Sequence, residues 1–335
     1  MKNRLPCPSI RSISVSAIAS IALSASAGSP GAVPPAVKTR VLRDASGSEA
    51  VVEPEFGGRV MSFSPRGAGR NVFWNAPAGS IDLNGWANHG GEKTWIGPQN
   101  LWPKIKGGPS WPPPKHFDSA EFPVESGSCD QTRSLSMASP AVSGGDACPF
   151  GVKREVSLEG EVLSVVARLV PSGCEIPEEA GLPAGSDDWH VWSIAQVPWS
   201  AEFAIRKTGL GRFKDVSSAT NVFSAAAPEA EGAGVVTMAI NPESNNGKIF
   251  FDGDAIAVGY PDGALVARRV PNDDDVDDYP FPLHGRAQLF TGWHGKRDAG
   301  GVRYLELEFT SVGTRPLKME FSFVAGVSAE EALRR

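Results

Sequence analysis

The sequence is poor in the motifs that identify several common classes of enzyme. It has four cysteines in 335 residues and no Cys-x-x-Cys pair, so it offers no cysteine-based zinc site. It contains no Gly-x-Ser-x-Gly or His-Glu-x-x-His motif and no phosphate-binding glycine loop, the usual signals of serine hydrolases, zinc proteases and nucleotide-binding proteins. Strongly amphipathic helices and short repeats are also missing, which argues against helical bundles, propellers and solenoids.

Long apolar runs are scarce too. One of them, residues 13–23, follows the basic residues Lys2, Arg4 and Arg11 and precedes Ala25-Ser26-Ala27. This order is typical of a secretory signal peptide that is cleaved after a small residue, and the run is short for a membrane span. We therefore predict cleavage near Ala27, no membrane partner, and export to the periplasm or the extracellular space.

Charge and cysteine content narrow the partners of the mature chain, which we expect to be one domain over residues 28–335. Without the signal peptide it has 29 basic and 38 acidic residues, a net charge of −9, which disfavours nucleic acid as a partner. Cys129 and Cys148 flank a Ser/Gly-rich polar stretch, and an oxidising compartment favours a disulfide between them. Cys174 is then left unpaired.

Period-two patterns predict an all-β fold. Short apolar strands alternate with turns rich in Gly, Pro and Asp, and helical periodicity is confined to residues 329–335. This pattern favours one large antiparallel β-supersandwich. The predicted strands are 37–43, 50–53, 57–63, 71–74, 151–158, 162–169, 189–197, 201–207, 235–241, 248–252, 255–260, 288–293, 303–310 and 318–323.

The segment Gly85–Asp118 stands out from this pattern. It holds four of the nine tryptophans, and its glycines and prolines interrupt every regular period, which predicts a long ordered loop. Flat indole rings among hydrogen-bonding side chains suit a carbohydrate, and the alternative is a loop that only caps the β core. The candidate ligands in the segment are His89, Glu92, Lys93, Trp95, Gln99, Trp102 and His116.

Two later strands add candidate residues. Strand parity places His190, Trp192 and Gln196 on one face of the strand 189–197, either as a binding surface or as the margin of the core. In the strand 303–310 the same parity places Glu306 and Glu308 together, either as the acidic floor of a cleft or as solvated residues. The acidic turn Asn272–Asp278 could suit calcium, but it lacks the glycine and glutamate of an EF-hand loop and favours a solvated turn.

Three short segments resemble a known family. Gly57–Phe63 and Gly69–Trp74 are similar to the N-terminal hairpin of galactose mutarotase-like proteins, and Asn88–Lys93 resembles the His-Gly-Gly segment of aldose 1-epimerases. The Gly-Gly-Glu-Lys-Thr-Trp run and the Trp-Pro-Pro-Pro block resemble exported bacterial members of this superfamily. The resemblance implies a mutarotase-like supersandwich that binds a monosaccharide or an oligosaccharide.

The resemblance also implies roles for individual residues. His89 matches a histidine that contacts the sugar, His190 matches the general acid, and Glu306 or Glu308 matches the catalytic base. Glu308 is the preferred base because it lies farther from the turn at Gly300-Gly301. The sequence departs from the family after His190, where Val-Trp-Ser-Ile replaces the usual x-Tyr-Phe-Asn-Leu.

Ring opening and closure of an aldose need one base and one acid but no metal and no cofactor. The sequence therefore favours an exported carbohydrate-binding protein, with epimerase chemistry as its candidate activity. A polysaccharide lyase or glycoside hydrolase and a non-catalytic carbohydrate-binding module remain the alternatives. A closed pocket around one ring would favour the epimerase, and an open groove would favour an enzyme acting on a polymer.

Overall fold

The computed structural model describes residues 39–77, 86–125, 133–142, 150–171, 189–217, 222–225, 234–271, 286–296, 300–311 and 315–335. The segment Lys38–Arg335 forms one compact unit. The predicted signal peptide at residues 1–27, the cysteines at positions 129, 148 and 174, and the predicted acidic turn at 272–278 lie outside the described residues. Their predictions therefore stay predictions.

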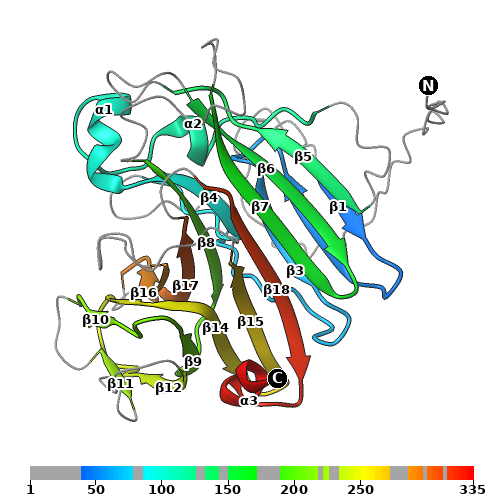
Figure 1. The fold of residues 1–335 in the computed structure, drawn as a ribbon, viewed down its shortest axis with the longest axis vertical. Coiled ribbons are helices and arrows are strands. Elements are labelled where there is room, and N and C mark those ends of the chain that lie inside the picture. The colour runs from blue at the N-terminus through cyan, green and yellow to red at the C-terminus, as the bar shows by residue number, and fades with distance from the viewer. Residues whose placement is uncertain are drawn as a thin grey trace, which may run out of the picture. The chain divides into compact units, whose positions relative to one another are not determined.

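Two nine-stranded antiparallel sheets make up the described structure (Figure 1). Every strand pairing in the described structure is antiparallel. Strands that are consecutive in the sequence form long hairpins, such as Phe150–Glu159 with Val162–Pro171. In spatial order the first sheet contains β1 (Arg40–Arg43), β2 (Glu49–Glu53), β3 (Arg59–Ser64), β4 (Glu92–Gly97), β8 (His190–Pro198), β17 (Val302–Thr310), β16 (Ala287–His294), β13 (Gly247–Phe251) and β10 (Phe213–Asp215).

The second sheet pairs strands from the middle and the end of the chain. Its order is β11 (Phe223–Ala225), β12 (Gly234–Ile240), β9 (Glu202–Lys207), β14 (Gly253–Tyr260), β15 (Gly263–Val270), β18 (Leu317–Ala325), β7 (Val162–Pro171), β6 (Phe150–Glu159) and β5 (Ser134–Ala138). Apolar side chains from both sheets, including Phe63, Val156, Leu305 and Phe321, form one buried core. The predicted all-β sandwich is therefore confirmed.

The tryptophan-rich segment is more regular than its composition predicts. Its residues Glu92–Gly97 form β4, a central strand that is buried on both faces, so the prediction of a continuous loop was wrong there. Gly90 and Gly91 permit this because they have positive φ, and a Cβ on Gly90 would lie 2.3 Å from the carbonyl oxygen of Trp74. Small residues thus let the chain enter the sheet at close quarters.

One predicted strand, at residues 71–74, does not form. The Oδ1 atom of Asn71 accepts hydrogen bonds from the backbone N–H groups of Phe63 and Phe73, each at 3.0 Å. The Trp74 N–H instead donates to the Gln196 carbonyl at 2.8 Å. The Asn71 side chain therefore accepts hydrogen bonds that a neighbouring strand would otherwise accept, and the chain continues towards β8.

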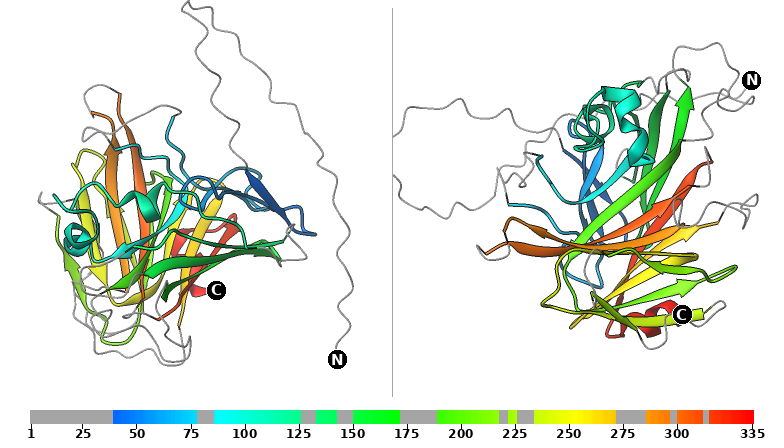
Figure 2. Two further views of the ribbon diagram at one scale, coloured as in Figure 1. Left: turned by 90° about the horizontal axis from the view of Figure 1, so that it is seen from above. Right: turned by 90° about the vertical axis from the view of Figure 1, so that its left-hand side faces the viewer.

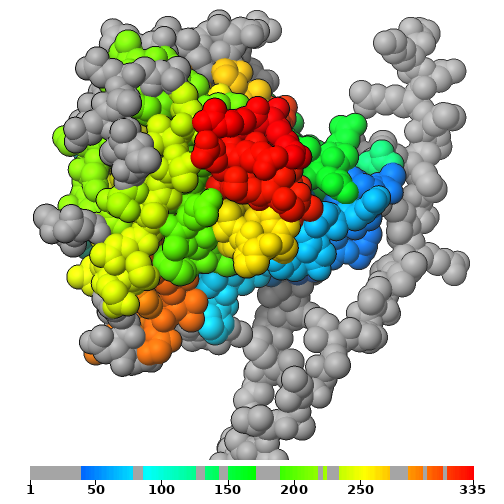
Figure 3. Space-filling model, turned by 90° about the horizontal axis from the view of Figure 1, so that it is seen from below, coloured from blue at the N-terminus to red at the C-terminus, as the bar shows by residue number. Residues whose placement is uncertain are grey.

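Short helices lie at the two ends of the sandwich. A 3₁₀ turn, η1 (Gln99–Leu101), leads into α1 (Trp102–Lys106), and α2 (Lys115–Asp118) follows; both helices lie at the end opposite to α3 (Ala329–Arg334) (Figure 2). Figure 3 shows α3 on the surface beside the second sheet, where Ala329, Ala332 and Leu333 are buried. Among the described residues, no helix is long and apolar enough to cross a membrane.

Candidate functional site

One face of the first sheet gathers polar and aromatic residues from five neighbouring strands. Alternate residues of a strand share a face, and residues paired across antiparallel strands lie on the same face. Trp95 of β4 pairs with Trp192 of β8, and Gln196 of β8 pairs with Glu306 of β17. The face turned away from the core therefore brings together residues that are far apart in the sequence.

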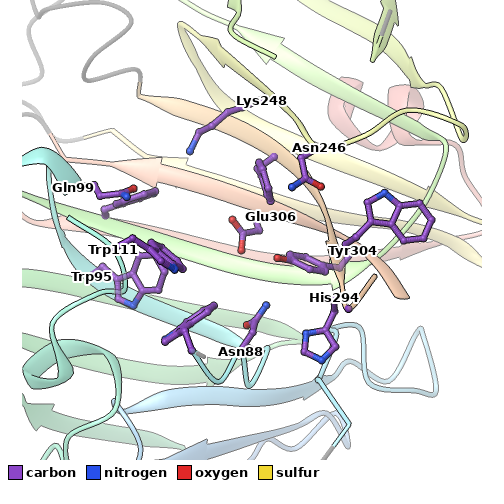
Figure 4. Close-up of a pocket in the computed structure, with 14 residues that line it drawn as sticks. Asn88, Trp95, Gln99, Trp111, Asn246, Lys248, His294, Tyr304 and Glu306 are labelled. Carbon is purple, nitrogen blue, oxygen red and sulfur yellow. The ribbon is translucent and has the colours of Figure 1, made fainter. Parts of the chain in front are cut away.

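This face is hollowed into a cavity of about 410 Å³. Trp95 and Trp111 lie towards one end, Tyr304 and His294 lie towards the other, and Glu306 lies between them (Figure 4). The lining residues are Trp86, Asn88, Trp95, Gln99, Trp111, Trp192, Asn246, Lys248, Phe290, Trp293, His294, Gly295, Tyr304 and Glu306. The cavity therefore combines aromatic walls with amide, imidazole, phenol and carboxylate groups.

The tryptophan rings at one end of the cavity pack edge to face. The ring of Trp95 lies 5.9 Å from Trp86, 6.1 Å from Trp111 and 5.5 Å from Trp192, measured between ring centroids. Such T-shaped pairs are the favoured aromatic geometry, and mutual packing restricts the rotamers of each ring. The cluster therefore presents its indole faces in fixed orientations.

A buried ion pair orients two of these rings. Asp118 accepts a hydrogen bond from Trp86 Nε1 at 2.8 Å and from Trp95 Nε1 at 3.0 Å. Arg59 neutralises the same carboxylate at 2.7 Å and also donates to the carbonyl of Gly90 at 3.2 Å. Asp118 and Arg59 were not predicted as site residues, since neither the ion pair nor its tryptophan partners can be inferred from local patterns.

Glu306 is the carboxylate of the cavity wall. It is partly exposed, and its Oε1 accepts a hydrogen bond from Gln196 Nε2 at 2.6 Å. Burial raises the pKa of Glu306 above its ordinary value of 4.5, Lys93 and Lys248 oppose this rise, and Glu308 adds to it. A carboxyl group with a raised pKa is suited to taking and returning a proton near neutral pH.

Glu308 has a different environment, although it lies two residues away on the same face. Its side chain is fully buried and accepts hydrogen bonds from Lys248 Nζ at 3.0 and 2.8 Å and from Trp192 Nε1 at 2.8 Å. These contacts occupy the carboxylate that the sequence favoured as the base. Distance from a turn does not indicate this pairing, because the lysine comes from β13, two strands away.

Lys93 lies beneath the tryptophans and is 1% exposed. Its Nζ atom lies 5.2 Å from the ring centroid of Trp86 and 4.8 Å from that of Trp95, and it has no hydrogen-bond partner among the described residues. Burial and the nearby Arg59 lower the pKa of Lys93 to about 8, while Glu306 opposes the shift. An ammonium group held only by aromatic faces is unusual for a buried charge.

His190 lies at a second, smaller hollow on the same face. This hollow measures about 170 Å³ and is lined by Pro98, Gln99, His190, Trp192, Lys248, Phe250, Gln288 and Thr310. His190 is six residues from Gln196, the partner of Glu306, which corresponds to about 20 Å of strand. The strand register therefore places His190 too far from Glu306 for the two side chains to flank one sugar ring, contrary to the prediction from the sequence.

His89 and His116 do not line either hollow. The half-buried His89 ring packs on Phe56 with centroids 4.1 Å apart, and burial together with Arg59 lowers the pKa of His89 to about 4. Its neighbour Asn88 reaches the cavity instead. His116 lies in α2 with its side chain exposed.

Two further candidates belong to the interior. Glu92 faces the core between the sheets, where Arg154 of β6 pairs with it and Ser193 Oγ donates to it at 2.7 Å. It shares no face with Lys93, because successive side chains of a strand alternate. Trp102 is fully buried behind Trp95 and donates from Nε1 to the carbonyl of Ile96 at 2.7 Å.

Several cavity residues were not anticipated. His294 is 8% exposed, and its Nδ1 atom finds no hydrogen-bond partner within the described part of the chain. Tyr304 stacks on Trp74 with centroids 4.7 Å apart, and Asn246 precedes β13. Extending the parity of the predicted strand 288–293 by one residue would have found His294. Within the described residues, no group of His, Cys, Asp and Glu side chains could hold a metal ion.

No protein-family model matches this chain, and no curated protein matches its sequence. Among solved structures, it is similar to an aldose 1-epimerase candidate from Escherichia coli K12, with 12% identity, a TM-score of 0.48, and coverage of 86% of this chain and 99% of the other. It is also similar to a galactose mutarotase-like protein from Lactobacillus casei ATCC 334, with 11% identity, a TM-score of 0.46, and coverage of 86% of this chain and 100% of the other.

A heparan sulfate lyase from Pedobacter heparinus gives 9% identity, a TM-score of 0.34, and coverage of 88% of this chain and 36% of the other. Mutarotase-like proteins, which the sequence motifs resemble, are thus among the structures similar to this chain. Similarity at this level concerns the fold alone.

Proposed function

We propose that this protein binds a carbohydrate in the tryptophan-lined cavity and that Glu306 acts there as the general base of a mutarotase-type reaction on an aldose. The observation that carries the proposal is one partly exposed carboxylate beside a wall of four tryptophans, Trp86, Trp95, Trp111 and Trp192. Indole faces suit the apolar face of a pyranose, and a carboxylate suits its hydroxyl groups.

The polar side chains of the cavity support this choice of ligand. Asn88, Gln99 and Asn246 each carry both a donor and an acceptor, as a ring of hydroxyl groups requires. Lys248 lines the cavity too, but its charge is paired with Glu308. A neutral polyol therefore fits the wall better than a strongly charged ligand.

The chemistry requires two linked proton transfers. Glu306 takes the proton of the anomeric hydroxyl as its C–O bond becomes a carbonyl, and the bond from C1 to the ring oxygen breaks. An acid protonates that ring oxygen, the C1–C2 bond rotates, and the reverse steps close the ring on the other face. The raised pKa of Glu306 suits it to both the uptake and the return of the proton.

His294 is our candidate for the acid, in place of His190. It lines the same cavity as Glu306, and its Nδ1 lacks a partner among the described residues. His190 lines only the second hollow. Tyr304, which lies between Glu306 and His294 in Figure 4, would then contact the sugar ring between base and acid.

The test is a Glu306→Gln variant assayed by sugar binding and by polarimetry of freshly dissolved α-anomers. Glucose, galactose and xylose are the first ligands to examine. We expect turnover to fall about 10²-fold or more while affinity changes little. Glu155→Gln is the matched control, because Glu155 is an exposed strand residue of the second sheet. Unchanged turnover in Glu306→Gln, or equal losses in both variants, would refute the catalytic role.

We also propose that the protein is exported and carries the Cys129–Cys148 disulfide. The basic start, the apolar run and Ala25-Ser26-Ala27 support export, and the polar stretch between the two cysteines supports the bridge. Intact mass of the secreted product should show a start near Gly28. Thiol titration of the unreduced, denatured protein should find one free cysteine, and three would exclude the bridge.

A further inference from the structure

The cavity beside Glu306 and the hollow beside His190 share part of their walls. Gln99, Trp192 and Lys248 line both. Trp192 and Lys248 are in contact, with the Lys248 Nζ atom 5.0 Å from the Trp192 ring centroid. The two hollows are therefore neighbours, and these three side chains form their common wall.

The shared wall lies along the direction of the strands. On β17 the cavity is lined by Tyr304 and Glu306, and the second hollow is lined by Thr310. These residues share one face, and the six residues from Tyr304 to Thr310 span about 20 Å of strand. Both hollows together therefore follow a path several times longer than one sugar ring.

The second hollow repeats the chemistry of the first. It has aromatic walls in Phe250 and Trp192 and polar groups in Gln288, Thr310 and His190. None of its lining residues in the described structure is an Asp or a Glu, and the neighbouring carboxylate of Glu308 is fully buried and paired with Lys248. Aromatic faces beside uncharged hydrogen-bonding groups again suit a sugar.

We propose that the two hollows are adjoining subsites for one carbohydrate chain, so that the ligand is an oligosaccharide or polysaccharide rather than a free monosaccharide. One sugar residue lies beside Glu306, and the chain continues past Trp192 towards His190. The inference rests on the proposed carbohydrate binding and adds the length of the ligand. It also gives His190 a place in the site, as a contact for a neighbouring sugar residue.

Chain length is the variable that tests this inference. Binding is measured for glucose, xylose and galactose and for their linear oligomers of two to four residues, by calorimetry on the wild-type protein. We expect affinity to rise about tenfold or more from monomer to tetramer in the series that binds, the gain typical of an added aromatic contact. A tetramer that binds no more tightly than its monomer would overturn the inference.

Two phenylalanines give a matched pair of variants. Phe250 lines only the second hollow and Phe290 lines only the cavity, and both side chains are partly exposed. Phe250→Ala should remove most of the gain with chain length and leave monosaccharide affinity unchanged, whereas Phe290→Ala should weaken both. A Phe250→Ala protein that keeps its unfolding temperature and the full gain would contradict the subsites.

The same data separate this inference from the proposed function. If a monosaccharide binds and longer chains add nothing, carbohydrate binding stands and the adjoining subsites fail. If neither monomers nor oligomers of any series bind to folded protein, the proposed function fails first. A ligand that binds only as an oligomer supports both.

Discussion

Adjacent residues of β4 show two different uses of a buried charge. Glu92 faces the core between the sheets, where Arg154 and Ser193 occupy its oxygens. Lys93 faces the cavity side and is equally buried, and its ammonium group contacts the rings of Trp86 and Trp95 without a hydrogen-bond partner among the described residues. Within the described structure, one step along the strand thus separates a charge in an ion pair from a charge that contacts aromatic rings.

The difference indicates which charges belong to the scaffold. A buried ion pair with additional hydrogen bonds loses little by being buried, whereas a buried ammonium without a hydrogen-bond partner is costly. The fold tolerates Lys93 beside Glu306, and both have shifted pKa values. Such shifts, in a cavity, are typical of functional groups. The core face should therefore govern stability, and the cavity face should govern binding.

The largest effect on stability is expected on the core face. Arg154→Met leaves Glu92 charged and unpaired in the core, so the free energy of unfolding should fall by about 3–5 kcal/mol. The double variant Glu92→Leu/Arg154→Met removes both charges and should recover most of this loss. Urea unfolding of the three proteins measures it. Equal losses in the single and the double variant would show that packing, not pairing, is responsible.

A smaller effect of opposite sign is expected on the cavity face. Lys93→Met removes an ammonium whose pKa burial lowers from 10.5 to about 8, so the free energy of unfolding at pH 7 should rise by roughly 2–3 kcal/mol. In the wild type, the unfolded chain binds more protons than the folded one between about pH 8 and 10.5. Wild-type stability therefore rises with pH across that window, and the difference from Lys93→Met should shrink.

Urea unfolding at pH 7 and at pH 9.5 checks this prediction, with Lys104→Met as a control on an exposed lysine of α1. The stabilising change should also weaken sugar binding, since it alters the floor beneath Trp86 and Trp95. A Lys93→Met protein that is less stable than the wild type at pH 7 would show that the ammonium has a partner.

The pH profile of turnover is the smallest and most specific effect. Activity should rise with pH as Glu306 loses its proton, at an apparent pKa above 4.5, and fall near pH 8 as Lys93 loses its own.

The same groups affect stability. The folded chain binds more protons at Glu306 than the unfolded one above pH 4.5, so this group destabilises the fold as pH rises through that window.

The comparison with Lys93→Met sharpens the assignment of the two limbs. The positive charge of Lys93 lowers the pKa of Glu306, so its removal should move the rising limb to higher pH. The falling limb should disappear. Because Glu306 and Lys93 interact, the apparent pKa of each limb describes the coupled pair and not one residue alone. A rising limb that stays in place would separate Lys93 from Glu306.

Local periodicity predicted well which side chains share a face of a strand, but it did not predict which residues of other strands contact them. The strand 303–310 alternates cleanly, so the shared face of Tyr304, Glu306 and Glu308 follows from the sequence alone. The choice between the two glutamates depends on Lys248, which reaches Glu308 from β13. Such a contact depends on strand order, because Lys248 is 60 residues from Glu308 in the sequence and Trp192 is 116 residues away. No local pattern contains that order.

The tryptophan-rich segment shows a second limit of prediction from local sequence, because its composition did not reveal the strand within it. Its composition predicted a sugar-binding surface, and Trp95 and Gln99 do line the cavity. Its glycines and prolines concealed β4, because they flank the strand rather than interrupt it. Once β4 is a strand, parity separates Glu92 from Lys93, a distinction that a loop does not make.

The central claim is that the carbohydrate site lies on the face of β4, β8 and β17 that is turned away from the core. A crystal structure of the protein soaked with the best-binding sugar tests it most directly. We expect a sugar ring against the indoles of the cavity, with a hydroxyl within hydrogen-bond distance of Glu306. A ring bound elsewhere on the molecule, with the cavity holding only solvent at saturating sugar, would contradict it.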